Sequence, residues 1–237
     1  GAGAYSDGKL TLTTEFGGML DQYMEKPALS GLIDYVDGIY LKFGATHTVY
    51  GDDNKEAVRQ LQKDAAAADL SLIPARIRHL GTDKCLEILT LMRDYLEDKC
   101  TIRTSDGVAR VIVEDGRYVG VETTRGEIFH SKYLIAAPGR EGSEWFAGQA
   151  AQLGLDMITN PVDIGVRVEV PAVVMEQITD VVYESKLVYY TKSFDDRVRT
   201  FCMNPYGVVV AENNAGLMTV NGHSNAEKTT ENTNFAI

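Results

Sequence analysis

The feature that most constrains the fold is a run of strand-forming residues over 101–137, which follows a helical stretch. The segment "VARVIVEDGRYVGVETTRGEIFHSKYLIAA" is rich in β-branched residues and is interrupted at Asp115-Gly116 and Arg125-Gly126. Asp-Gly between two such runs is a strong hairpin signal, because both residues tolerate the positive φ of a tight turn. We predict a three-stranded antiparallel meander over this run. A buried strand, "YLIAA", follows it and ends at Pro138-Gly139.

Helical patterns lie on both sides of this meander. Apolar residues recur at helical spacing over 29–43, over 53–70 and after the Gly81-Thr82-Asp83 turn. A further helix is predicted from Ser143 to Leu153, where Gly154 stops it and where Trp145, the single tryptophan, packs the helix onto a sheet.

Residues 156–237 contain mostly strand patterns. "DIGVRVEVP" alternates apolar and polar residues, as a half-buried strand does. "VRTFCMNPYGVVVAENNAGLMTVNGHSN" predicts three strands that share one antiparallel sheet, joined by Asn-Pro-Tyr-Gly and Asn-Asn-Ala-Gly turns. The final "SNAEKTTENTNFAI" is polar and predicts no closing element. The sequence therefore predicts an α+β fold.

Composition narrows the class of partner. The 237 residues include 23 Lys and Arg against 34 Asp and Glu, a net charge of −11 that opposes a nucleic-acid partner. No apolar run approaches the roughly 18 residues of a membrane span, so no membrane partner is expected. Cys85, Cys100 and Cys202 form neither a C-x-x-C pair nor a metal-ligand pattern with the four scattered histidines. Unpaired cysteines indicate a reducing cytoplasm, and Cys85 and Cys100 are expected in the core.

The order of these elements resembles a known family. In flavoproteins a β-meander follows the cofactor helix, and the next strand ends in a small-residue turn against the pyrophosphate. With "GAGAYSDGKL", "RHLGTDKCLEIL", "LIAAPGREGSEWF", "DIGVRVEVP", "RTFCMNPYGVVV" and "VNGHSN", the chain resembles the bacterial uncharacterised FAD-dependent (NAD/FAD-utilising) dehydrogenases of the glutathione-reductase-like group. The resemblance implies FAD as cofactor, with NAD(P) as a further one, and redox chemistry on a small-molecule substrate. It implies no particular reaction.

The resemblance also implies site residues. Those expected to approach the flavin or its diphosphate are Gly3, Ser6, Asp7, Gly8, Lys9, Gly81, Thr82, Asp83, Ala137, Pro138 and Gly139. Those expected on the substrate side are Arg140, Arg167, Cys202, Asn204, Tyr206 and His223. Arg140 and Arg167 offer cations for a phosphate or carboxylate. Simple turn formation and helix capping remain the alternatives for the glycine loop and for Gly81-Thr82-Asp83. The sequence identifies no catalytic residue and no metal ligand.

The resemblance also bears on domain organisation. Family members carry a Gly-x-Gly-x-x-Gly unit before the "SDGKL" loop, and no such unit follows a strand in this sequence. We therefore expect an internal fragment of a longer flavoprotein. Residues 1–155 would be the remnant of a discontinuous FAD-binding domain with a helical insertion at about 30–70, and 156–237 part of a β-rich substrate domain.

Two other functions stay open. One is a tRNA-modifying flavoprotein, which the acidic balance and the lack of a Lys/Arg stripe oppose. The other is a non-catalytic binding domain whose flavin fold is vestigial. The oligomeric state is not predicted.

Overall fold

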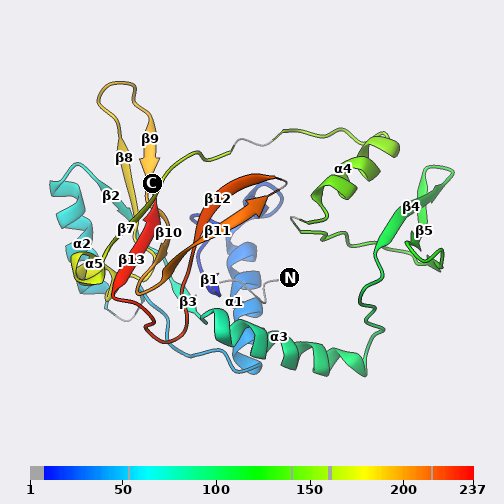
Figure 1. Cartoon of the computed structure of the whole chain (residues 1–237), viewed down its shortest axis with the longest axis horizontal. Helices are drawn as coiled ribbons and strands as arrows, with labels where there is room; N and C mark the ends of the chain where they lie inside the picture. The colour runs from blue at the N-terminus through cyan, green and yellow to red at the C-terminus, as the bar shows by residue number, and fades with distance from the viewer. Residues whose placement is uncertain (1–7, 53, 140, 160–161, 215) are drawn as a thin grey trace. The chain divides into compact units, whose positions relative to one another are not determined.

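The chain folds into helices and small antiparallel sheets that group into two compact units. The computed structural model describes residues 8–52, 54–139, 141–159, 162–214 and 216–237 (Figure 1). The first unit combines residues 8–94 with Ile164–Ile237, and the second comprises Tyr95–Asp163. Both contain helices and strands, so the α+β class is confirmed.

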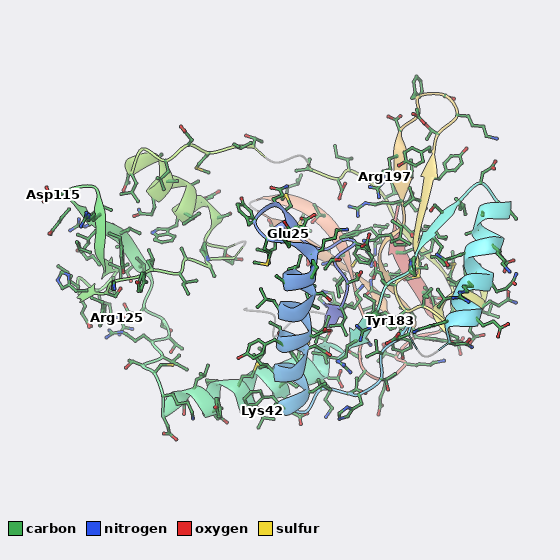
Figure 2. All side chains as sticks on the ribbon, turned by 180° about the vertical axis from the view of Figure 1, so that it is seen from behind. Glu25, Lys42, Asp115, Arg125, Tyr183 and Arg197 are labelled. Carbon is green, nitrogen blue, oxygen red and sulfur yellow. The ribbon has the colours of Figure 1, made fainter. Side chains whose placement is uncertain are left out.

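The helices of the first unit follow the apolar periodicity of the sequence. After a short 3-10 helix, η1 (Leu20–Gln22), come α1 (Lys26–Lys42), α2 (Lys55–Ala67) and α3 (Thr82–Glu97), whose last residues fall in the second unit. α5 (Ala172–Thr179) follows later in the chain. Figure 2 labels Glu25 and Lys42 at the two ends of α1. The Asn54 side chain caps α2 by accepting from the Ala57 N–H at 3.0 Å. The predicted helices over 29–43, 53–70 and after Gly81 are thus confirmed.

In the described residues of the first unit, ten strands pair into four sheets. The strands are β1 (Lys9–Thr11), β2 (Ser71–Ile73), β3 (Ile77–His79), β7 (Arg167–Pro171), β8 (Lys186–Tyr190), β9 (Arg197–Arg199), β10 (Phe201–Asn204), β11 (Val208–Asn214), β12 (Leu217–His223) and β13 (Asn232–Ala236). The sheet orders are β1-β3, β2-β8-β9, β10-β13-β7 and β11-β12. All pairs are antiparallel.

The β2–β8 pairing explains why distant parts of the chain form one unit. It joins residues 71–73 to 186–188 across the intervening meander. Residues 71–73 therefore share a sheet with part of the C-terminal segment, and the meander stands in a unit of its own.

The strand β13 corrects two predictions about the C-terminal region. It is the central strand of its sheet, between β10 and β7, although its sequence "NTNFA" predicted no element. Because β10 pairs with β13 and β11 pairs with β12, the predicted single sheet of these three C-terminal strands is also wrong. β13 was not predicted because the side chains that it buries are polar: Thr233 and Asn234 are both 0% exposed. A pattern search based on apolar residues does not detect such a strand.

The second unit confirms the predicted meander. β4 (Val108–Glu114), β5 (Arg117–Thr123) and β6 (Ile128–His130) pair in the order β4-β5-β6, all antiparallel. α4 (Ser143–Gln152) lies against β4, because Trp145 Nε1 donates to the Ala109 carbonyl at 3.0 Å and Gln149 Oε1 accepts from the Val111 N–H at 2.8 Å. The predicted packing of Trp145 on a sheet is therefore confirmed.

The strand predicted from "YLIAA" is absent from the described part of this unit. Residues 133–137 have no regular structure, and Ile135 is 92% exposed. An apolar run of this kind is buried only when neighbouring strands cover it, and no strand in the described residues pairs with it. The prediction of a buried strand here was wrong.

The cysteines divide between core and surface. Cys85 is buried with Ala45, Leu80 and Ile88 in an apolar cluster between the end of β3 and α3. Cys100 is exposed just after α3, so its predicted place in the core was wrong. The apolar periodicity of α3 ends before Cys100, which leaves that side chain outside the buried face.

The turn between β4 and β5 gives a first testable prediction. Asp115 and Gly116 have φ of 47° and 73°, as the predicted tight turn requires. Gly116→Ala should lower the free energy of unfolding by about 1–2 kcal/mol, because an L-residue resists left-handed φ. A Cβ at Gly116 meets no atom within 4 Å, so the loss would come from backbone strain and not from a clash.

The control for this turn is Gly107→Ala in the same unit, where φ is not left-handed and a Cβ makes only ordinary contact with Thr124. Urea denaturation of both variants provides the measurement. Equal stability of Gly116→Ala and Gly107→Ala would contradict the strained turn.

Candidate functional site

A cluster of polar side chains lies in the interior of the first unit. His79 Nε2 is 3.0 Å from the Tyr183 hydroxyl and 3.1 Å from Ser224 Oγ, and these two oxygens are 2.7 Å apart. Ser224 Oγ also donates to Asn204 Oδ1 at 3.5 Å. The His79 and Tyr183 rings stack with centroids 4.3 Å apart. We call His79, Tyr183, Asn204 and Ser224 the His79 cluster. Tyr183 is labelled in Figure 2.

The start of α3 is attached to the segment that supplies Ser224. The backbone N–H and Oγ1 of Thr82 both donate to the Ser224 carbonyl, at 3.2 and 3.1 Å. The Ala226 N–H donates to Asp83 Oδ1 at 3.0 Å, and this hydrogen bond lowers the pKa of Asp83. Gly81 has φ of 87°, and a Cβ there would collide with the Ala226 backbone. In the structure, the predicted Gly81-Thr82-Asp83 group therefore binds protein atoms.

The described part of the glycine loop also contacts protein. Lys9 Nζ lies 3.0 Å from Glu184 Oε2, donates to the Met203 carbonyl at 2.9 Å and lies 3.8 Å from Cys202 Sγ. The Gly8 carbonyl accepts from the Leu80 N–H at 2.9 Å. A Cβ at Gly8 would collide with Cys85 and Leu80, which accounts for a glycine there. Gly3, Ser6 and Asp7 lie outside the described residues.

Three of the predicted substrate-side residues meet in one place. Arg167 donates to the Cys202 carbonyl at 2.9 Å and to Asn234 Oδ1 at 2.6 Å. Asn204 is fully buried and donates to the same Cys202 carbonyl at 2.8 Å. A side chain at Gly222 would collide with Arg167 and Asn204. These residues join β7, β10, β12 and β13, and the Arg167 guanidinium is bound to protein acceptors.

Tyr206 and His223 make other contacts within the first unit. The Tyr206 hydroxyl donates to Glu176 Oε1, and Lys228 Nζ lies 3.7 Å from the centroid of the Tyr206 ring. His223 ends β12 opposite Val208 and is half-buried, directly before Ser224. Ala137, Pro138 and Gly139 belong to the second unit. Arg140 lies outside the described residues.

A cavity of about 350 Å³ opens beside the His79 cluster, within the first unit. The segment between α1 and α2 forms one side, and the end of β3 with α3 forms another. The polar or charged side chains that line it are Thr46, Thr48, Tyr50, His79 and Lys84. Its apolar wall is formed by Ala45, Leu80 and Ile88 of the buried cluster.

Sequence reasoning assigned no functional role to His79 or Lys84. Both flank the predicted Gly81-Thr82-Asp83 turn in "RHLGTDK". A histidine placed at the end of a strand, two residues before a glycine turn that opens a helix, was a usable signal. The position of His79 alone did not predict a function, because a single histidine has no chemical partner within its own sequence segment.

Lys186 is a buried cation in the same unit. Its Nζ lies 3.6 Å from the ring centroid of Phe16 and 5.6 Å from that of Phe201. Burial lowers the pKa of Lys186, and the nearby Glu184 carboxylate opposes that shift. The Lys186 amine therefore binds its proton more tightly in the unfolded chain than in the folded chain.

The Lys186 shift predicts a pH dependence. Stability should rise with pH between the lowered pKa of Lys186 and its ordinary value of about 10.4. Lys186→Met should flatten this rise and be neutral or stabilising at neutral pH, because the cost of burying the charge is removed. Urea denaturation of both proteins from neutral pH to about pH 10 measures the difference. Parallel pH profiles would contradict the prediction.

The described residues contain neither a candidate metal site nor a candidate membrane-spanning helix. No group of three or more His, Cys, Asp or Glu side chains in the described part of the chain is placed to hold a metal ion. No helix in that part combines the length and the apolar character needed to cross a membrane.

Comparison with known proteins adds no assignment: no protein-family model matches the chain, and no curated protein matches it.

Proposed function

We propose that the chain belongs to an FAD-dependent oxidoreductase that acts on a small molecule. The proposal comes from the sequence resemblance, and one structural observation supports it. Four segments singled out from the sequence converge in the first unit, around the His79 cluster and its cavity. They are Gly8-Lys9, the start of α3, Cys202 to Asn204, and the stretch after His223. A cavity with a few convergent polar groups is the usual form of a small-molecule site.

Two of the predicted cofactor glycines do not offer a flavin cradle. A cradle needs glycines whose bare α-carbons face open space. At Gly8 and Gly81 that space is filled by Cys85, Leu80 and the Ala226 backbone. We therefore assign the substrate side of the proposed enzyme to the first unit.

The chain alone should accordingly bind FAD weakly or not at all. Calorimetric titration of the 237-residue chain with FAD measures this. Binding tighter than about 1 μM, the range of a specific complex, would show that these residues hold the cofactor after all.

The proposed function is tested on the protein expressed from its complete open reading frame. We expect the visible absorption bands of oxidised flavin, either as purified or after reconstitution with FAD. A reducing substrate should bleach them without air. A colourless protein that takes up no flavin would contradict the proposal and favour a non-catalytic binding domain. Retention of tRNA at moderate salt would favour a tRNA-modifying flavoprotein.

A further inference from the structure

We propose that the cavity beside His79 binds a small hydroxy acid, with the carboxylate at Lys84 and the hydroxyl at His79. As a statement of the enzyme's substrate class this rests on the proposed function, but the binding itself needs no flavin. The volume of about 350 Å³ lies within the range of sites that enclose small metabolites.

The charges of the cavity favour an anion. Its polar lining supplies the Lys84 ammonium, the His79 imidazole and the hydroxyls of Thr46, Thr48 and Tyr50, and none of the described residues that line it is acidic. This contrasts with the net charge of −11 for the whole chain. An anionic ligand would therefore find several hydrogen-bond donors at this place.

Lys84 can exchange its present partner for a ligand. Its Nζ lies 2.7 Å from Glu87 Oε2, one turn along α3, and both side chains are more than half exposed. The Glu87 hydrogen bond raises the pKa of Lys84, so the ammonium stays charged at neutral pH. An exposed pair of this kind is held weakly, and a carboxylate in the cavity can compete with Glu87.

The apolar side chains that line the cavity select for an apolar body. Ala45, Leu80 and Ile88 are each almost completely buried and belong to the apolar cluster behind the cavity. A ligand made only of charged groups would place charged atoms against these apolar side chains. A short branched carbon chain that extends from the carbon bearing the hydroxyl matches them.

His79 supplies the second polar contact. Its Nε2 meets the two hydroxyls of Tyr183 and Ser224, and a hydroxyl can either donate or accept. When Nε2 carries no proton, Tyr183 can donate to it and Ser224 to Tyr183. When Nε2 is protonated it can donate to Ser224, which then donates to Asn204 Oδ1. The cluster therefore accommodates Nε2 of the ring that lines the cavity both with and without a proton.

The test uses 2-hydroxy-4-methylpentanoate as the probe, titrated into the protein at neutral pH by calorimetry. Its amide removes the carboxylate charge, and 4-methylpentanoate removes the hydroxyl. We expect the hydroxy acid to bind about tenfold more tightly than either analogue, the effect of losing one charge-assisted or buried hydrogen bond. Equal binding of acid and amide would overturn the proposal, as would no binding of the acid.

Variants separate the two contacts. Lys84→Gln is exposed and should fold normally, and it should abolish the preference for the acid over its amide. The control is Lys26→Gln, an equally exposed lysine paired with Glu15 outside the cavity, which should leave that preference unchanged. His79→Gln should abolish the preference for the hydroxyl while the acid still binds better than the amide. An unchanged preference in Lys84→Gln would place the anion elsewhere and overturn the proposal.

The outcomes separate this inference from the proposed function. A protein that binds the hydroxy acid but takes up no flavin contradicts only the oxidoreductase. A flavin-containing protein that ignores the hydroxy acid contradicts only the substrate class.

Discussion

Replacing Asp37 with Ala should lower the free energy of unfolding by about 3–5 kcal/mol, the usual loss when one partner of a buried ion pair is removed. Asp37 lies on α1, and its two carboxylate oxygens accept from Arg78 Nε and NH2 at 2.6 and 2.7 Å. Both residues are buried, and Arg78 NH1 also donates to the Thr46 carbonyl. The variant leaves a guanidinium buried without its counter-charge. Urea denaturation gives the difference.

Asp34→Ala is the matched control for Asp37→Ala. Asp34 lies one turn earlier on the same helix, and its carboxylate is 3.9 Å from Arg76 with both side chains largely exposed. Its loss should be under about 1 kcal/mol. The double variant Asp37→Leu with Arg78→Met should recover much of the stability, because no buried charge remains. Equal losses from Asp34→Ala and Asp37→Ala would refute the role of the buried pair.

Lys9→Met should have the second-largest effect, a loss of about 3 kcal/mol. The pair of Lys9 with Glu184 is 11% and 8% exposed, and the same ammonium binds the Met203 carbonyl. Methionine fills a similar volume but removes the Lys9 ammonium from Glu184, which keeps the electrostatic attraction of Lys186. Thermal and urea unfolding measure the loss.

The control for Lys9→Met is Lys26→Met, which breaks an exposed Lys–Glu pair and should change stability by less than about 1 kcal/mol. The comparison also decides between two roles for Lys9. The sequence predicts that Lys9 approaches the flavin, whereas in the structure it pairs with Glu184. Unchanged stability of Lys9→Met, with loss of flavin from the complete protein, would favour the cofactor role.

The parts of the fold that sequence reasoning predicted are those set by local signals. α1, α2 and α3 follow from apolar residues at helical spacing, and the β4–β5 hairpin follows from Asp115-Gly116. β13 was missed because its burial depends on Arg167, a residue 67 positions away that binds Asn234. Whether a polar strand is buried depends on the segments that pair with it, so the sequence of the strand alone does not predict its burial.

The candidate site shows the same limit. Gly81 and Gly8 were correctly recognised as unusual, since both adopt left-handed φ. Their close neighbours are protein atoms, however, and no short motif distinguishes a glycine that faces a cofactor from one that faces Ala226. His79 was passed over because Tyr183 and Ser224, which give it its chemistry, lie 104 and 145 residues further along the chain.

The central place of β13 has a consequence for synthesis on the ribosome. β7 and β10 both emerge before β13, and neither pairs with the other. Until residues 232–236 are made, these two strands have no shared partner, and Arg167 lacks its Asn234 acceptor. The whole of Tyr95–Asp163 has been translated by then. The second unit can therefore fold as the chain grows, whereas the first unit completes its sheet only after residues 232–236 have been made.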